Sequence, residues 1–125
     1  MTEDFTIEAS SPIKVAAAFT GLRFLPWWWA ISSNNANPML EIGGDGIRYK
    51  VIARNERRFD EIEQVDVKTA WRTVNLCFRF KGAVTTFSAN VRELDEAARA
   101  LKLLPEHVPL GERARELRPG TQTTT

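Results

Sequence analysis

Hydrophobic and polar residues alternate along much of the chain, as they do in strands that bury one face. One such alternation surrounds the sequence Gly43-Gly44-Asp45-Gly46. Its apolar members stand on both sides of that sequence: Leu40, Ile42, Ile47, Tyr49 and Val51. Alternation on either side of a glycine-rich turn predicts a β-hairpin. Glycine adopts positive φ angles at no steric cost, so we expect these glycines to make the tight turn in that way.

The same alternation predicts strands at four further places: residues 5–9, the neighbourhood of Val65 and Val67, residues 74–80 and residues 85–89. A short turn at residues 59–62 is expected to lead into the second of these. The last two strands form a second hairpin around Gly82-Ala83, with Phe78, Phe80 and Phe87 on its buried side. Residues 54–58 (Arg-Asn-Glu-Arg-Arg) are expected to form a charged turn.

An N-terminal segment has the 3.6-residue period of an α-helix instead. Ser10-Ser11-Pro12 is a typical helix start, because serine is a good N-cap and proline suits the first helical position. Apolar residues then recur on one helical face: Val15, Ala18, Phe19 and Leu22. This pattern predicts an N-terminal helix, which Pro26 ends. A polar loop at residues 32–38 follows it.

A second helix is predicted near the C-terminus. Asn90 is a suitable N-cap, and Glu93 stands three residues later, as in a capping box. The apolar residues that follow share one helical face: Leu94, Ala97, Ala98, Leu101 and Leu104. Pro105 ends the helix. We expect this face to pack on the strands, where its three leucines contribute on the order of 5 kcal/mol, at about 1.5 to 3 kcal/mol each.

Length and charge add little that is specific. The 125 residues are enough for one domain with a hydrophobic core, and 17 basic against 16 acidic residues leave a net charge of +1. A near-neutral chain has no overall attraction to nucleic acid or to anionic membranes. Cys77 is the only cysteine, which favours a reducing compartment, and the acidic start Met1-Thr2-Glu3-Asp4 is unlike a signal peptide.

Trp27, Trp28 and Trp29 form the most unusual cluster in the chain. They lie near the end of an apolar stretch at residues 15–31, which is about the shortest length that spans a membrane. Arg23 and Pro26 lie inside that stretch and argue against a span. Burial against the strands is the simplest interpretation. The alternative is that the tryptophans occupy a membrane interface or a groove on a partner, since each has a large apolar body and one donor.

The residues whose side chains could act in catalysis or bind a metal do not form a recognisable site. His107 is the only histidine and Cys77 the only cysteine, so neither a zinc site nor an activated thiol is expected. Strand alternation is expected to scatter the neighbouring carboxylates over two faces: Asp60, Glu61, Glu63 and Asp66. Gly43-Gly44-Asp45-Gly46 is not a phosphate loop, because no helix start follows it. We therefore predict a protein without enzymatic activity, metal or cofactor.

Arg54, Arg57 and Arg58 are candidates for a basic binding edge. Trp71 and Arg72 follow further along the chain, and arginines combined with aromatic residues can hold single-stranded nucleic acid. The acidic residues around the arginines argue against a nucleic-acid partner.

The order of these segments resembles that of the bacterial pleckstrin-homology-like domains. The resemblance rests on the Asp45-Gly46 turn, the segment at residues 59–67 (Phe-Asp-Glu-Ile-Glu-Gln-Val-Asp-Val), the strand at residues 75–80, the return strand with Phe87, and one closing helix. It covers residues 38–104. The resemblance implies a strongly bent antiparallel sheet or partial barrel, closed by the C-terminal amphipathic helix, and a role in binding rather than catalysis. Phosphoinositide-binding relatives carry lysine and arginine at the first hairpin turn, where this chain has Asp45, so we do not extend that ligand to it.

We therefore expect a mainly β fold with α-helices: one PH-like domain over residues 1–112, with its core at 38–104, its N-terminal strand, helix and Trp-rich segment at 5–31, and a disordered tail at 113–125. The predicted function is binding or assembly through another protein, a second copy, or a membrane surface. The candidate binding residues are Trp27, Trp28, Trp29, Arg54, Arg57 and Arg58. A small-ligand carrier or enzyme that uses the barrel mouth, and a nucleic-acid binder, are the alternatives. We expect a cytoplasmic location, with peripheral attachment to the inner face of the membrane as the alternative.

Overall fold

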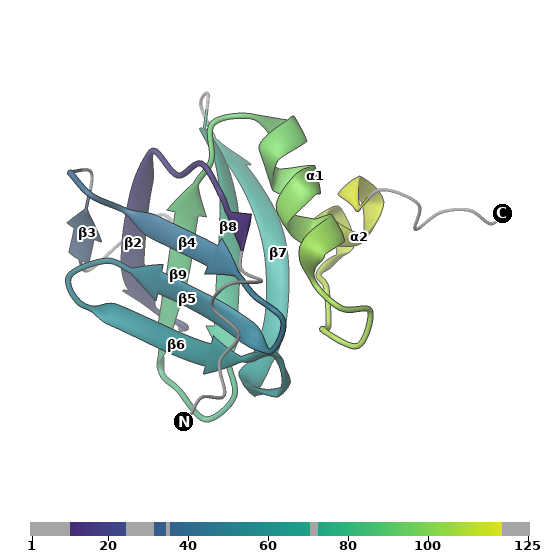
Figure 1. Cartoon of the computed structure of the whole chain (residues 1–125), viewed down its shortest axis with the longest axis horizontal. Coiled ribbons are helices and arrows are strands. Elements are labelled where there is room, and N and C mark those ends of the chain that lie inside the picture. The colour runs from purple at the N-terminus through teal and green to yellow at the C-terminus, as the bar shows by residue number, and fades with distance from the viewer. Residues whose placement is uncertain (1–10, 25–31, 35, 71–72, 119–125) are drawn as a thin grey trace, which may run out of the picture.

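The computed structural model describes residues 11–24, 32–34, 36–70 and 73–118, and this part of the chain is mainly β (Figure 1). One antiparallel sheet has four strands, in the order β1 (Ser11–Pro12), β4 (Met39–Ile42), β5 (Gly46–Lys50) and β6 (Arg54–Arg58). The other has five, in the order β3 (Ser32–Asn34), β2 (Ala17–Leu22), β9 (Thr85–Asn90), β8 (Thr73–Phe80) and β7 (Ile62–Ala70). A 3₁₀ turn, η1 (Phe59–Glu61), leads into β7, and α1 (Leu94–Leu103) and α2 (Glu112–Leu117) follow the strands. Among the described strands, the two sheets do not pair into a closed barrel.

The first predicted hairpin is present as β4 and β5, with Leu40 opposite Tyr49 and Ile42 opposite Ile47. All of its predicted apolar positions are buried. The expected role of the glycines is wrong, however, because Gly82 is the one described glycine with a positive φ, at 72°. Gly46 is needed for space instead: a Cβ at this position would overlap the backbone of Arg57 and Arg58 on β6.

The second hairpin, β8 and β9, supplies the other half of the core. Phe78 lies opposite Phe87, and both are fully buried. The ring of Tyr49, on the four-stranded sheet, stacks on Phe87 and Phe80 with ring centroids 4.2 and 5.6 Å apart. These aromatic contacts join the two sheets face to face, and the four-stranded sheet lies in front of the other in Figure 1.

The predicted N-terminal helix is wrong, because Ser11–Pro12 and Ala17–Leu22 are the strands β1 and β2. Strand β2 pairs along its length with β9 and also pairs with β3, so its backbone groups bond to neighbouring strands. A short apolar run has no periodicity that separates a buried strand from a helix, and tertiary pairing decides between them. Part of the predicted polar loop is also strand, as β3. The strand predicted at residues 5–9 lies outside the described residues.

The charged turn predicted at residues 54–58 is also a strand, β6, which pairs with all of β5. A strand of charged residues suits this position, because β6 is the edge of its sheet and charges discourage pairing with other chains. The turn predicted to precede Val65 is present as η1, and the half-buried strand is present as β7.

Helix α1 confirms the predicted C-terminal helix but begins later, at Leu94. Asn90 is the last residue of β9, and its side chain accepts a hydrogen bond from the Arg92 N–H at 2.9 Å instead of capping the helix. Leu101 and Leu104 are buried, whereas Leu94 is 42% exposed. The helix packs against β8 and lies beside β7 in Figure 1.

The tail predicted at residues 113–125 is ordered in its first part, where α2 packs on β7. The Val65 N–H donates to the Pro109 carbonyl at 3.0 Å, and the Gly111 N–H donates to the Val65 carbonyl at 2.9 Å. A carboxylate oxygen of Asp66 accepts the Ala114 N–H of α2 at 3.1 Å. These bonds attach the C-terminal segment to the edge of the five-stranded sheet. Residues 119–125 lie outside the described part of the chain.

Candidate functional site

Of the six predicted binding residues, the structure describes only the three arginines. Trp27, Trp28 and Trp29 lie outside the described residues. Arg54 and Arg58 are exposed on β6. Arg57, one residue out of phase with them, faces the other side of the strand and places its guanidinium 4.8 Å from the centre of the Phe80 ring.

Arg57 belongs to the edge of the core. Its guanidinium lies beside the Tyr49 hydroxyl and lowers the pKa of that group, but burial is the larger effect and raises this pKa above its usual value. A cation over an aromatic face stabilises a fold by about 0.5 to 2 kcal/mol, depending on its exposure. The structure therefore gives Arg57 a structural role, and leaves Arg54 and Arg58 as surface charges.

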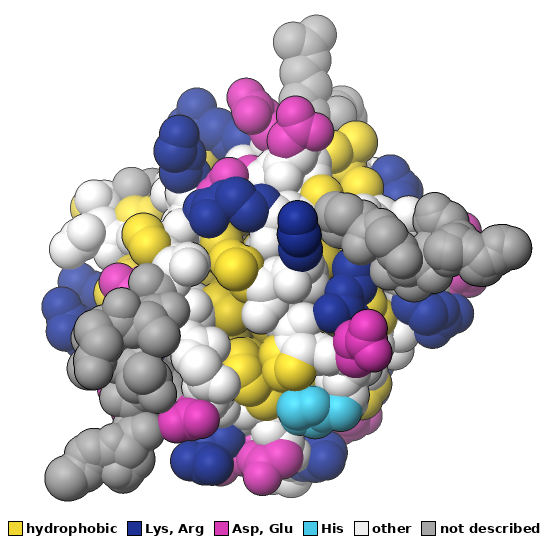
Figure 2. Space-filling model, turned by 45° about the vertical axis from the view of Figure 1, so that its right-hand side comes forward, with side chains coloured by type: hydrophobic (Ala, Val, Ile, Leu, Met, Phe, Trp, Pro, Cys, Tyr) yellow, Lys and Arg dark blue, Asp and Glu magenta, His cyan; other side chains and the backbone are white. Residues whose placement is uncertain are grey.

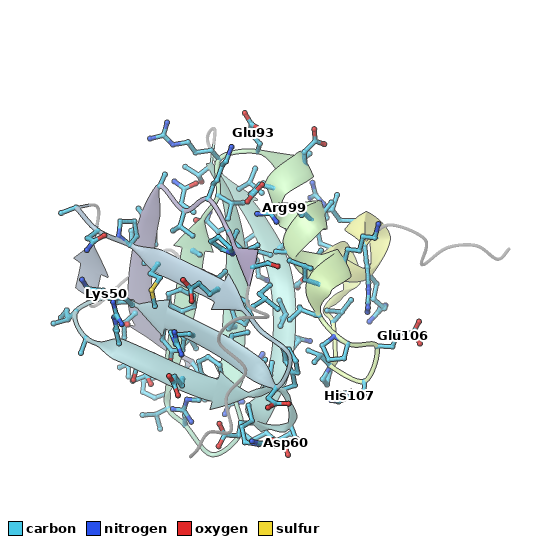
Figure 3. The ribbon with its side chains drawn as sticks, viewed as in Figure 1. Lys50, Asp60, Glu93, Arg99, Glu106 and His107 are labelled. Carbon is cyan, nitrogen blue, oxygen red and sulfur yellow. The ribbon has the colours of Figure 1, made fainter. Side chains whose placement is uncertain are left out.

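The single histidine and the single cysteine lie apart. His107 is exposed after α1, with its ring edge-on to Phe59 at 6.5 Å between centroids, and it is visible at the surface in Figures 2 and 3. Cys77 is buried on β8, and burial raises the pKa of its thiol to about 11 even though it hydrogen bonds with Ser88. The thiol is therefore protonated at neutral pH.

The neighbouring carboxylates have separate partners. Asp66 holds the start of α2, and Glu63 pairs with Arg23. Glu61 accepts the Arg58 backbone N–H at 3.0 Å, and Asp60 is exposed on η1 at the lower end of the molecule in Figure 3. In the described residues, no three histidine, cysteine or acidic side chains could jointly hold a metal ion.

Two exposed apolar side chains mark one end of the five-stranded sheet. Phe24, just after β2, is 70% exposed, and Val84, just before β9, is 58% exposed. The Arg23 N–H donates to the Val84 carbonyl at 2.8 Å, so the two chain segments are paired there. Lys81 is exposed in the same turn as Val84. We call Phe24 and Val84 the apolar tip; it is followed in the sequence, three residues after Phe24, by the three tryptophans.

Beside the apolar tip, the outer face of the five-stranded sheet has a hollow of about 180 Å³. Its polar lining comes from three adjacent strands: Gln64 and Lys68 on β7, Cys77 and Arg79 on β8, and Thr86 and Ser88 on β9. These residues alternate with core residues, so the same strands that bury Phe78 and Phe87 inside present polar side chains outside. Gly21 on β2 also lines the hollow. We call this feature the outer hollow.

The charges near the outer hollow are unevenly paired. Arg23 binds both carboxylate oxygens of Glu63 at 2.7 Å, and this pairing lowers the pKa of Glu63. Arg79 makes a longer contact of 3.5 Å to the same carboxylate, and its buried Nε has no hydrogen-bond partner among the described residues. Lys68 lies 3.9 Å from Asp66. Of these three cations, Arg79 is the one with a buried donor that has no partner among the described residues.

Sequence reasoning did not identify either surface. Phe24 lies within the apolar stretch at residues 15–31, where nothing in the sequence distinguishes it, and Val84 lies in a turn without a functional motif. The residues of the outer hollow are spread over more than sixty positions of the chain, and only strand pairing brings them together.

The fold and these surfaces define a small, mainly β protein with an apolar end and a polar outer face. No family model matches the chain, and no curated protein matches it. No helix in the described residues is long and apolar enough to cross a membrane.

Proposed function

We propose that the protein is a non-enzymatic binding module on a PH-like scaffold, and that it docks on an anionic membrane surface through the apolar tip. The scaffold part of the proposal is supported by two facing antiparallel sheets with a helix, α1, after the last strand. The docking part is supported by one observation: Phe24 and Val84 are both largely exposed at the same end of one sheet.

The chemistry around the apolar tip favours a membrane over another protein as the partner. Apolar side chains gain free energy when they enter the interfacial region of a bilayer, and each nearby lysine or arginine adds about 1 kcal/mol on an anionic surface. Lys81 stands next to the tip, and Arg79 is only weakly paired. The three tryptophans that follow Phe24 in the sequence are of the type enriched at membrane interfaces.

Vesicle sedimentation tests this proposal. The protein is mixed with vesicles of phosphatidylcholine alone, or of phosphatidylcholine with phosphatidylglycerol. We expect binding to the anionic vesicles only, and we expect salt to weaken it. The double variant Phe24→Ser with Val84→Ser should weaken binding about a hundredfold or more, because each buried apolar side chain contributes about 1.5 kcal/mol or more.

Ile52→Ser is the matched control. Ile52 is 75% exposed but follows β5, on the four-stranded sheet, so its replacement matches the loss of one exposed apolar side chain of the tip at a different place. Equal losses for the control and the tip variants would contradict docking through the tip. Absence of vesicle binding, with self-association that the tip variants abolish in analytical ultracentrifugation, would make a second copy of the chain the partner instead.

A further inference from the structure

The outer hollow has the donor chemistry of an anion site. Strand register places Gly21, Thr86, Arg79 and Gln64 in one row across β2, β9, β8 and β7. Adjacent strands are about 4.8 Å apart, so the three side chains in this row can reach one small group between them. They offer a guanidinium, a hydroxyl and an amide N–H₂, all of which can donate hydrogen bonds. Gly21 has no side chain to fill its end of the row.

Arg79 supports this assignment further, because one donor of its guanidinium has no acceptor among the described residues. Its contact with Glu63 is at 3.5 Å, the outer limit of a hydrogen bond, and the same carboxylate is already held by Arg23 at 2.7 Å. Its Nε is shielded from solvent and has no partner among the described residues. A buried donor without an acceptor is costly, so an acceptor that reaches this guanidinium would offset that cost.

Size and charge define the ligand. The hollow of about 180 Å³ is room for roughly six water molecules at about 30 Å³ each, or for one compact oxyanion with a small substituent. Three cations and two carboxylates line or border it, which leaves one positive charge. A tetrahedral phosphate group has oxygens enough to meet donors from three strands at once, whereas a planar carboxylate has only two.

We propose that the outer hollow binds a phosphate group, held by Arg79 with Gln64 and Thr86 beside it. The ligand is a phosphate monoester or a phospholipid headgroup, which share this chemistry. The inference does not rest on membrane docking by the apolar tip, because it uses other side chains and a soluble probe can test it alone.

Titration calorimetry with inorganic phosphate and with glycerol 3-phosphate is the first experiment. We expect saturable binding that Arg79→Gln weakens about tenfold or more, since a charge-assisted pair is lost, and that Thr86→Val weakens about two- to tenfold. Arg54→Gln is the matched control, because it removes the same charge from an exposed position on the other sheet and should change the affinity less than twofold. Thermal unfolding by circular dichroism confirms that each variant is folded.

A second experiment, vesicle binding with phosphatidylglycerol, identifies the source of the phosphate group. If Arg79→Gln weakens vesicle binding and Phe24→Ser does so independently, the hollow takes a headgroup; if only the soluble probes respond to Arg79→Gln, it takes a soluble ester. The proposal is overturned if no probe binds saturably. It is equally overturned if Arg54→Gln lowers the affinity as much as Arg79→Gln, because that result would mean non-specific attraction by charge.

Discussion

Gly111 and Asp66 are 45 positions apart in the chain but lie in close contact. This contact predicts a strong energetic coupling between substitutions at the two positions. A Cβ added at Gly111 would overlap the carboxylate of Asp66. The φ angle of Gly111 is −72°, which suits any residue, so the requirement for glycine comes from space and not from backbone strain. Gly111→Ala therefore acts by displacing the Asp66 side chain.

The cost of that displacement can be worked out from the bonds Asp66 makes. Its Oδ1 accepts the Ala114 N–H of α2 at 3.1 Å and the Val67 N–H at 2.8 Å. Removing a helix cap costs about 0.5 to 2 kcal/mol, so we expect Asp66→Ala to destabilise the protein by about 1 to 2 kcal/mol. Gly111→Ala loses the same cap and also forces crowded atoms apart, for a total of about 2 to 3 kcal/mol.

The double variant separates the two effects. Without the Asp66 carboxylate, the new methyl group has nothing to displace, so Gly111→Ala with Asp66→Ala should cost about as much as Asp66→Ala alone. A few tenths of a kcal/mol are added because alanine is a poorer N-cap than glycine. The four proteins therefore form a cycle with a coupling free energy of about 2 kcal/mol.

Urea unfolding followed by circular dichroism measures all four free energies of unfolding, and thermal midpoints check them at roughly 3 to 6 °C per kcal/mol for a chain of this size. If Gly111→Ala costs as much in the Asp66→Ala background as in the wild type, the close approach is not the reason for the glycine, and the reasoning is refuted.

Four further predictions use other contacts. Gly46→Ala should cost about 3 kcal/mol in urea unfolding, because its methyl group would meet the β6 backbone, which cannot move aside; a cost below 1 kcal/mol would contradict this. Arg57→Ala should lower the free energy of unfolding by about 1 kcal/mol through loss of the contact with Phe80, and Arg54→Ala, its exposed neighbour, should change it by less than about 0.5 kcal/mol. Arg99 lowers the pKa of Glu96 below its ordinary value of 4.5. The Glu96 carboxylate therefore stabilises the fold above pH 4.5, and this stabilisation is lost as the pH falls through the lowered pKa. Glu96→Gln should destabilise the protein at pH 7 and make no difference at about pH 2. Cys77 has a thiol pKa of about 11, so roughly one part in a thousand is thiolate at pH 8. Iodoacetamide should therefore modify Cys77 far more slowly in the native protein than in urea, and mass spectrometry measures both rates.

The parts of the fold that the sequence predicted are those with strong local signals. Both hairpins combine alternation with a glycine-containing turn, and α1 has a long apolar face that ends at Pro105. The parts it missed depend on distant partners. Strand β6 has no apolar alternation and is a strand because β5 lies beside it, and α2 is only six residues long and is held by Asp66.

The candidate surfaces follow the same rule. Arg57 looks identical to Arg54 and Arg58 in the sequence, and only the phase of β6 separates a core contact from two surface charges. The row of Arg79, Thr86 and Gln64 requires the register of three strands, including the irregularity between Ile62 and Gln64 in β7, which no local pattern reveals.

The attachment of residues 109–111 to β7 limits strand pairing between copies of the protein at this edge. Val65 pairs with Leu110 in a parallel bridge at the outer edge of the larger sheet, so its N–H and carbonyl are occupied from within the same molecule. A protein shortened to residue 105 would expose these groups at the edge of β7, and exposed strand edges can pair with strands of other molecules. The C-terminal segment therefore covers hydrogen-bonding groups at the edge of β7, and its removal should make pairing with a strand of another molecule easier.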